Sequence, residues 1–237
     1  MTTPTTDEKF GPVVSDTPAQ PPSYDIKLSG QYATIVPIHP DHAAGLYELV
    51  SGEENTSLFD YLFDEPPESL ETFRATLARK AGTTNPWTYT ILAQSGTEER
   101  PQPVGMVSLM RMDHKNRVIE VGSILYTPAL QRTPAATETM YMLARYVFET
   151  LGFRRYEWKC NSLNQPSRRA AARLGFSYEG TFRQHMIAKG RNRDTAWYAI
   201  LDSEWPAVKQ AMEDWLHKDN FDEEGGQKRR LEEFRVV

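Results

Sequence analysis

Residues 156–197 read YEWKCNSLNQPSRRAAARLGFSYEGTFRQHMIAKGRNRDTAW, and this stretch decides the fold of the chain. Alternating side chains at its start predict a strand, and a polar turn, a short helix over 166–174, a stop at Gly175 and further strand follow. The region is also basic: residues 145–193 hold eleven Lys or Arg and three Glu, whereas the whole chain has a formal net charge of −5. Such segregation indicates one site for an anionic ligand rather than a nucleic-acid-binding surface.

The composition indicates a soluble globular protein with one main domain. Of the 237 residues, 39% are hydrophobic and 25% are charged, which is enough apolar material for a sizeable core. Cys160 is the only cysteine, so no disulfide can form within the chain and a reducing compartment is expected. No apolar run has the length of a signal peptide or a membrane span, and the first 73 residues lack arginine. We therefore expect a cytoplasmic protein, with the nucleus also open, and neither a membrane nor a nucleic acid as its partner.

Prolines and charges mark the two ends of the chain. Residues 1–23 hold prolines at positions 4, 12, 18, 21 and 22 and predict a flexible arm. Residues 24–216 predict a single domain, and residues 217–237, mostly charged, predict a solvated tail. Three apolar side chains could instead dock this tail on the domain, namely Phe221, Leu231 and Phe234.

Hydrophobic periodicity predicts a mixed arrangement of helices and strands between these ends. Helices are expected over 41–50, 68–81, 133–151 and 166–174. Strands are expected over 87–93, 104–112, 118–126, 156–160 and 195–201. Thr133-Pro134 supplies the N-cap and first turn of the third helix, and Gly152 ends it. This order is typical of an α/β domain with a mixed sheet.

Several common catalytic motifs are absent from the sequence. It contains no Walker-type phosphate loop, no G-x-G-x-x-G, no H-E-x-x-H and no G-x-S-x-G. The five histidines and the single cysteine lack metal-ligand spacing, so no metal is expected. These absences exclude most kinase, dinucleotide-dependent, metalloenzyme and serine-hydrolase functions.

Three blocks carry a resemblance to a known family: Glu120-Val-Gly-Ser-Ile-Leu-Tyr126, Gln131 to Glu138, and Asn164-Gln-Pro-Ser-Arg-Arg-Ala-Ala-Ala-Arg-Leu-Gly-Phe176 with Glu179-Gly180. From about Ser29 to Trp205 the chain resembles the Gcn5-related N-acetyltransferase (GNAT) superfamily, within it the RimJ/RimL type of ribosomal-protein N-terminal acetyltransferase. The resemblance implies a mixed, mostly antiparallel sheet in which two parallel strands, 118–126 and 155–160, splay apart. It also implies acetyl-CoA as the cofactor.

The resemblance assigns residues to this cofactor. The exposed strand edge at Ile124, Leu125 and Tyr126 would bind the pantetheine arm by main-chain hydrogen bonds, as in strand addition. Asn164 would contact the same arm, and Ser167 would lie near the sulfur. Arg168 and Arg173 would face the 3′-phosphate or only water. The pyrophosphate would lie at the start of the following helix, where free amides meet it, at Gln131, Arg132, Thr133, Ala135, Ala136 and Thr137.

The predicted phosphate loop departs from the pattern of the family. Pro134 stands where glycine is usual, and it removes one N–H donor. Arg132 and the Thr133 hydroxyl could replace that contact. The alternative is that these residues only start a helix, and Asn164 and Ser167 could likewise serve only as helix caps.

Two residues are candidates for the general base that an acetyl transfer to an amine requires. Glu120 lies on the strand that enters the splay, and His185 has an intrinsic pKa suited to neutral pH. The alternatives are an ordinary exposed strand glutamate and a structural histidine. Asp194 would orient a base or hold the amine, or be a turn residue. Ser167 or a tyrosine would protonate the leaving thiolate, while Cys160 is expected to pack inside the domain, so that no acyl-enzyme forms.

The acceptor amine is the least defined part of the expected reaction. A small-molecule amine is favoured, the α-amine of a protein N-terminus is the alternative, and a non-catalytic acyl-CoA-binding protein is a third possibility. Tyr61 and Phe63 are expected in a loop that faces the acceptor. Either a monomer or a homodimer is consistent with the sequence.

Overall fold

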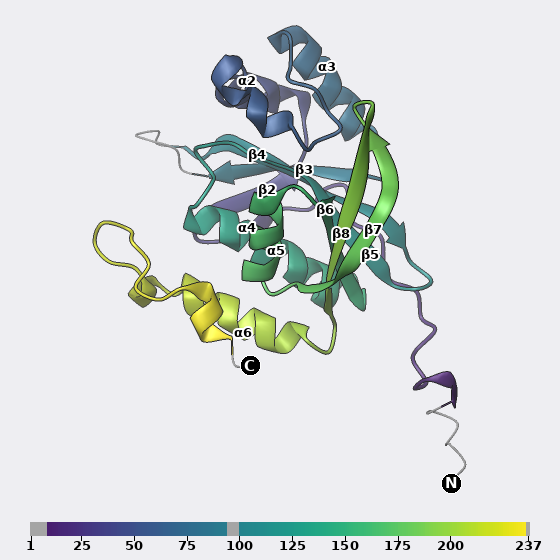
Figure 1. Ribbon diagram of the computed structural model, residues 1–237. Coiled ribbons are helices and arrows are strands. Elements are labelled where there is room, and N and C mark those ends of the chain that lie inside the picture. The colour runs from purple at the N-terminus through teal and green to yellow at the C-terminus, as the bar shows by residue number, and fades with distance from the viewer. Residues whose placement is uncertain (1–8, 94–99, 236–237) are drawn as a thin grey trace.

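The computed structural model describes residues 9–93 and 100–235, which form one eight-stranded sheet with helices on both faces (Figure 1). The order of the strands is β1-β2-β3-β4-β5-β6-β8-β7. They span Leu28–Ser29 (β1), Ala33–Pro37 (β2), Trp87–Ala93 (β3), Gln102–Asp113 (β4), Val118–Tyr126 (β5), Arg155–Asn161 (β6), Ser177–Ala188 (β7) and Arg191–Leu201 (β8). All neighbouring strands are antiparallel except β5 and β6. The predicted mixed, mostly antiparallel sheet is therefore confirmed.

Five α-helices accompany the sheet. They span Ala43–Val50 (α2), Leu70–Ala81 (α3), Pro134–Arg145 (α4), Gln165–Arg173 (α5) and Trp205–Leu216 (α6). Short 3-10 turns cover Pro40–His42 (η1), Glu53–Phe59 (η2), Lys218–Asn220 (η4) and Leu231–Phe234 (η5), and a π-helical turn (η3, Tyr146–Thr150) extends α4. The predicted helices and strands all have counterparts here, β7 is part of the further strand expected after Gly175, and β1, β2 and α6 are additional. Most residues of β7 are exposed, which explains why its hydrophobic pattern is weak.

The parallel strands β5 and β6 separate after four residue pairs. Val118–Val121 pairs with Arg155–Trp158, and the remainder of each strand diverges, as the family resemblance implies. A bulge in β5 lies just beyond this point, because Gly122 is opposite Ser108 and Leu125 is opposite Met106, so two residues of β5 face one of β4. The positive φ of 47° at Ser123 belongs to this bulge.

The two faces of the sheet carry separate cores. The larger core joins α4 and α6 to the face that holds Tyr156, Trp158 and Cys160. The smaller one joins α2, α3 and Phe59 to Met106 and Leu125 on the other face. In Figure 1, α2 and α3 lie at the top and α6 at the bottom, with the sheet between them.

Glu138 anchors α4 to the sheet. Its carboxylate is buried and accepts hydrogen bonds from the backbone amides of Gln31 (2.7 Å), Tyr32 (2.7 Å) and Ala33 (2.8 Å). A side chain at Gly30 would collide with this carboxylate, so the turn between β1 and β2 requires glycine there. The contact holds the helix whose N-terminus borders the splay.

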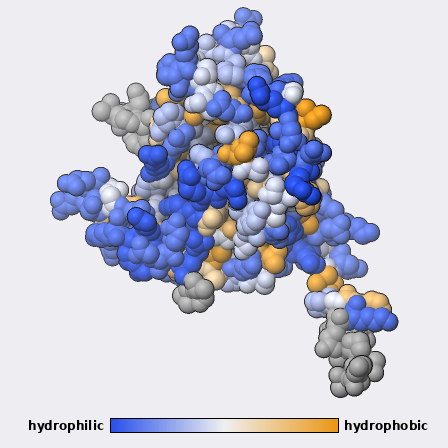
Figure 2. Space-filling view, in the orientation of Figure 1, coloured by the Kyte–Doolittle hydropathy of each residue, from blue (hydrophilic) through white to orange (hydrophobic). Residues whose placement is uncertain are grey.

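The C-terminal segment packs on the domain and is not the solvated tail that its charge predicts. Leu231 is 1% exposed, the Asn220 amide donates to the carbonyls of Trp215 and Arg229, and the Arg235 guanidinium donates to the Ala172 carbonyl. Its charged residues turn outward and leave this side of the surface hydrophilic (Figure 2). A few apolar anchors therefore outweigh many surface charges, since charges at a surface lose little hydration on folding.

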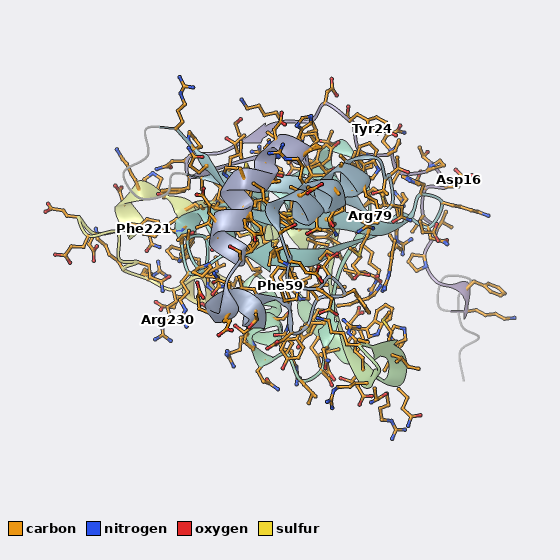
Figure 3. The ribbon with its side chains drawn as sticks, turned by 90° about the horizontal axis from the view of Figure 1, so that it is seen from above. Asp16, Tyr24, Phe59, Arg79, Phe221 and Arg230 are labelled. Atoms are coloured by element: carbon orange, nitrogen blue, oxygen red, sulfur yellow. The ribbon has the colours of Figure 1, made fainter. Side chains whose placement is uncertain are left out.

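The N-terminal arm is partly packed in the described residues. The amide of Ala19 donates to the His114 carbonyl, and Tyr24 lies 4.3 Å from Trp87 between ring centroids. Residues 1–8 and 236–237, the outer parts of the expected arm and tail, lie outside the described residues. Asp16 and Tyr24 lie on the opposite side of the molecule from Phe221 and Arg230 (Figure 3). Among the described helices, none combines the length and the apolar character that crossing a membrane requires.

Candidate active site

The opening between β5 and β6 leaves one backbone edge of β5 without a strand partner. Leu125 and Tyr126 pair with β4 on one side only, and Ile124 lies in the bulge beside them. Backbone N–H and C=O groups on such an edge can bind an extended, amide-containing ligand. The residues predicted to contact a pantetheine arm are thus brought together at the opening.

The N-terminus of α4 begins next to this edge. The Thr133 hydroxyl caps the helix by accepting from the Ala136 amide (3.2 Å), and it donates to the Leu130 carbonyl (2.7 Å). The amides of Arg132 and Ala135 have no hydrogen-bond acceptor in the described part of the chain. Free amides at a helix N-terminus favour an anion, and the exposed Arg132 side chain adds a positive charge. These groups fit a pyrophosphate despite the donor that Pro134 removes.

Gln131 and Tyr126 fix the shape of the loop before α4. The Gln131 amide side chain donates to the Tyr126 carbonyl (2.8 Å), and the Tyr126 hydroxyl donates to the Ala136 carbonyl (3.2 Å). Both bonds join the strand edge to the helix N-terminus. Hydrogen bonds therefore connect the predicted contact residues of β5 with those at the start of α4.

The N-terminus of α5 lies at the far side of the opening. The Asn164 side chain caps α5 by accepting from the Ser167 amide (3.1 Å), and the Trp158 indole donates to the Ser167 hydroxyl (3.0 Å). Capping by Asn164, one of the two roles considered, is thus observed. The Ser167 oxygen therefore accepts from the indole, and its own proton is shared between the neighbouring Cys160 sulfur and the opening.

Cys160 lies behind Ser167 and is 4% exposed. Burial raises the pKa of its thiol, while a hydrogen bond with Ser167 and the charges of Arg168 and Arg193 lower it. A thiol in this environment is a poor nucleophile. Its burial agrees with the expectation that it packs inside the domain.

Arg168 and Arg173 each have a protein partner. The Arg168 guanidinium donates to the Tyr198 hydroxyl (3.1 Å) and lies 5.7 Å from the centre of the Tyr178 ring. Arg173 donates to the buried Thr137 hydroxyl (3.0 Å) and lies over the Trp215 ring of α6. The partners tie α5 to β8 and to α4 and α6. A phosphate contact by either arginine stays a prediction.

Glu120 is buried and paired with two cations, in contrast to the exposed strand glutamate considered as an alternative. It is 4% exposed, and its Oε2 lies 3.2 Å from Nη1 of Arg111 and 2.9 Å from Nζ of Lys159. Lys159, with a side chain 6% exposed, also contacts Glu157 (2.6 Å) and lies 3.9 Å from the centre of the Trp197 ring. The second oxygen, Oε1, is the one without a cation partner among the described residues, so it is the atom available to accept a proton.

Lys159 was not among the residues predicted from the sequence, although the strand pairing indicates its role. Glu120 is opposite Glu157 in the parallel pairing, and Lys159 lies two residues further along the same face. Two neighbouring carboxylates repel each other unless a cation lies between them. Two carboxylates opposite each other on paired strands therefore predict a cation between them, and Lys159 is that cation.

His185 lies on β7 and is exposed. Its Nδ1 is 3.0 Å from the Thr195 hydroxyl of β8, and its ring contacts those of Phe182 and Trp197. Phe182 to His185 line a shallow hollow on the surface. His185 thus lies at the exposed edge of the sheet face that carries Thr195 and Trp197, whereas Glu120 is buried on that face.

Asp194 holds the bulge in β7. Its Oδ1 accepts from the Gln184 amide (2.7 Å) and from the Asn192 side chain (2.9 Å), and Gln184 has a φ of 51°. These hydrogen bonds, with the Gln184 amide as the largest cause, lower the pKa of the Asp194 carboxyl. Asp194 makes no hydrogen bond to His185 within the described ranges, so the turn role is the one observed.

The segment between α2 and α3 closes over this face. The Lys189 ammonium at the tip of the β7–β8 hairpin donates to the Phe59 carbonyl (3.0 Å) and to Glu65 (3.0 Å). At the other side, the Tyr61 hydroxyl donates to the Leu163 carbonyl (3.4 Å). Figure 1 shows the hairpin rising toward α3. Tyr61 and Phe63, the predicted acceptor-facing residues, belong to this bridging segment.

Residues 9–93 and 100–235 hold no group of three or more His, Cys, Asp or Glu side chains arranged to bind a metal ion. The site instead consists of a strand edge, two helix N-termini and a face of charged side chains.

Comparisons with known proteins agree with this geometry. A family model described as an acetyltransferase (GNAT) domain matches residues 33–177, more than half of the chain. A GCN5-related N-acetyltransferase from Brucella melitensis is 44% identical, with a TM-score of 0.87 over 92% of this chain and 97% of that one. A probable GNAT-family acetyltransferase from Chromobacterium violaceum is 33% identical, with a TM-score of 0.74 over 87% of this chain and 99% of that one.

A curated relative comes from Bacillus subtilis. It is named putative ribosomal N-acetyltransferase YdaF and is 27% identical over 183 residues, which are 76% of this chain and 96% of the relative. These matches cover most of the chain. They include the splayed strands, the bulge in β5 and the N-termini of α4 and α5. The chain belongs to the GNAT family of N-acetyltransferases.

Proposed function

We propose that the protein transfers the acetyl group of acetyl-CoA to the primary amine of a small molecule, by direct attack in a ternary complex. One observation carries this proposal: the groups suited to bind the cofactor and the candidate base lie next to each other where β5 and β6 separate. The β5 edge and the α4 and α5 N-termini lie at the opening, and Glu120 lies at the base of the adjoining face. When bound, acetyl-CoA supplies an activated acetyl thioester. Amides at the β5 bulge near Ile124 are suited to polarise its carbonyl oxygen.

The acceptor must lose a proton before it can attack. A lysine-type amine with a pKa of about 10.4 requires roughly 4.6 kcal/mol to be neutral at pH 7, and an α-amine near 7.7 about 1 kcal/mol. Oε1 of Glu120 is favoured as the base because it lies at the splay, 3.3 Å from where a side chain at Gly122 would begin. His185 is the second candidate, further from the β5 edge. As the N–C bond forms and the C–S bond breaks, the amine proton passes to the base.

Ser167 is the proposed proton donor to the departing thiolate. The indole of Trp158 fixes its oxygen, so the hydroxyl proton can turn from the Cys160 sulfur toward the departing thiolate. Cys160 takes no part, because it is buried behind Ser167. The role of Ser167 thus depends on a side-chain orientation set by the strand β6.

The 51–69 segment that covers part of this face supports a small acceptor. Lys189 and Tyr61 tie the 51–69 segment to both the β7–β8 hairpin and the turn before α5. A folded protein would have to thread its N-terminus past these contacts. The alternative, acetylation of a protein N-terminus, is favoured by the name of the Bacillus relative, a putative ribosomal N-acetyltransferase.

An amine panel with acetyl-CoA, monitored by thiol release, tests the proposal. The panel contains amino acids, amino sugars, polyamines and short peptides, and intact-mass analysis of ribosomal proteins forms a second arm. We expect release above the hydrolysis background with at least one small amine. Release with peptides or protein N-termini alone would favour the alternative. Tight coenzyme A binding without release in either arm would favour a non-catalytic acyl-CoA-binding protein.

A further inference from the structure

Arg193 is a buried cation that has no carboxylate partner in the described chain. It lies on β8 and is 8% exposed. Its Nη1 donates to the Thr195 hydroxyl (2.9 Å) and contacts the Met186 sulfur (3.2 Å). The guanidinium carbon lies 5.4 Å from the centre of the Phe63 ring.

These contacts use only some of the hydrogen-bond donors of the Arg193 guanidinium. The donors on Nε and Nη2 have no acceptor among the described residues, and a hydroxyl, a thioether and a ring face are all uncharged. A buried charge without an opposite charge is costly, and almost all buried arginines are paired. Burial and the nearby charge of Arg111 accordingly lower the pKa of Arg193. Such a group is prepared for an anion that is not part of the protein.

Arg193 differs in this respect from the other cations on its face. Arg111 and Lys159 are both paired with Glu120. No carboxylate among the described residues forms a salt bridge with Arg193. Glu120 is nevertheless close enough for its charge to raise the pKa of Arg193. The face therefore presents a carboxylate oxygen at Glu120 and an unpaired guanidinium at Arg193.

Strand pairing puts both groups on the same face. Lys159 of β6 is opposite Trp197 of β8, and Asn161 is opposite Thr195. Every second residue of β8 therefore lies on the face that carries Glu120 and Lys159, namely Arg193, Thr195 and Trp197. The segment with Phe63 covers this face from above. A small molecule with both an amine and an anionic group would find a partner for each end here.

We propose that the acceptor is a small amine that also carries a carboxylate, such as an α-amino acid, and that Arg193 binds this carboxylate. The inference rests on the proposed function and specifies its substrate class. Arginine suits the role because its planar donors match a carboxylate in a bidentate manner. Binding at Arg193 would direct the amine of the same molecule toward Glu120.

Paired substrates test the proposal directly. The twenty L-amino acids and their carboxamides are compared by thiol release at fixed acetyl-CoA, and kcat/KM is measured for each active pair. We expect the best amino acid to exceed its carboxamide by at least about tenfold, the loss typical of one charge-assisted bidentate contact. Arg193→Gln should remove this preference by lowering the rate for the carboxylate much more than the rate for the carboxamide.

Two further variants control for folding and for charge. Arg193→Lys keeps the charge but not the planar donors, so an intermediate preference is expected. Arg191→Gln removes an exposed arginine two residues away and should leave the preference unchanged. Equal rates for carboxylates and carboxamides in the natural protein, or an unchanged preference in Arg193→Gln, would overturn the proposal.

A binding measurement separates this inference from the proposed function. N-acetyl-L-amino acids and their carboxamides are titrated calorimetrically into the natural protein and Arg193→Lys in the presence of coenzyme A. Carboxylate-dependent binding without any turnover would support the anion site and contradict the acetyl transfer. Turnover with no carboxylate dependence in rate or binding would leave the transfer intact and reject the anion site. Acetylation of peptides alone would also reject it.

Discussion

The two sides of the splay are built from different chemical groups. The proposed cofactor side consists of backbone amides and short capping side chains, as at Ile124, Thr133 and Asn164. The acceptor side consists of long charged side chains from distant segments, such as Glu120, Lys159 and Arg193. Backbone groups suit a ligand that is the same in every relative. Side chains can be exchanged without altering the fold, so they are where a change of acceptor can be made.

Removing the proposed base has the largest expected effect on the acceptor side. Glu120→Gln keeps the shape of the side chain but cannot take a proton, so kcat should fall by about 10² to 10⁴ with coenzyme A affinity little changed. His185→Asn should lower it far less. Steady-state thiol release across pH 6–9 measures both, and Glu71→Gln, an exposed glutamate on α3, is the control. Full turnover in Glu120→Gln together with a large loss in His185→Asn would reverse the assignment.

The Lys159 contact gives the next largest effect, on stability. Lys159→Met leaves Glu120 and Glu157 facing each other without the cation between them. Because Arg111 and Arg155 still pair with these carboxylates, we expect a loss below the roughly 3–5 kcal/mol of an uncompensated buried charge, which denaturant unfolding can measure.

A double variant serves as the control for this prediction. Adding Glu120→Gln to Lys159→Met removes one of the two carboxylates that have lost Lys159, so it should recover part of the lost stability. Equal loss in the single and double variants would mean that Lys159 acts through packing on Trp197 alone.

The same contrast explains what could be predicted from the sequence. Turn and cap residues such as Thr133 and Asn164 occur in short motifs, because each acts on the helix that follows it directly. Arg193 and Phe63 are 130 positions apart, and no local pattern predicts their contact. Glu138 was missed for this reason too, since its three partners lie more than 100 residues earlier.

The C-terminal segment shows the limit of charge as a predictor. Its composition indicates a solvated tail, yet Leu231 and Asn220 hold it against α6. Composition averages over a segment, whereas docking depends on single residues that face inward. The bulge at Ser123 was missed for a related reason, because serine at positive φ has no distinctive sequence signal.

A cap substitution tests the cofactor side. Thr133→Val removes the hydroxyl that accepts from the Ala136 amide, which should lower stability by about 1 kcal/mol and weaken coenzyme A binding about fivefold. Calorimetric titration and denaturant unfolding measure the two effects. Ser69→Ala removes the equivalent cap of α3, remote from the splay, and should lower stability alone. Equal coenzyme A affinity in both variants would mean that the α4 N-terminus does not bind the phosphates.

The smallest effect is expected at Cys160, which lies next to the opening but belongs to neither side. Burial raises the pKa of its thiol, so the thiolate forms only well above neutral pH and alkylation of the folded protein at pH 8 should be slow. Because the proposed attack by the amine is direct, Cys160→Ala should change kcat less than about twofold even though the residue touches Ser167. Intact-mass analysis after mixing with acetyl-CoA should find no acetylated protein. A stable acetyl adduct that disappears in Cys160→Ala, together with lost turnover, would instead establish a covalent route. The acceptor side would then act on an acyl-enzyme, and its chemistry could no longer be considered separately from that of the cofactor side.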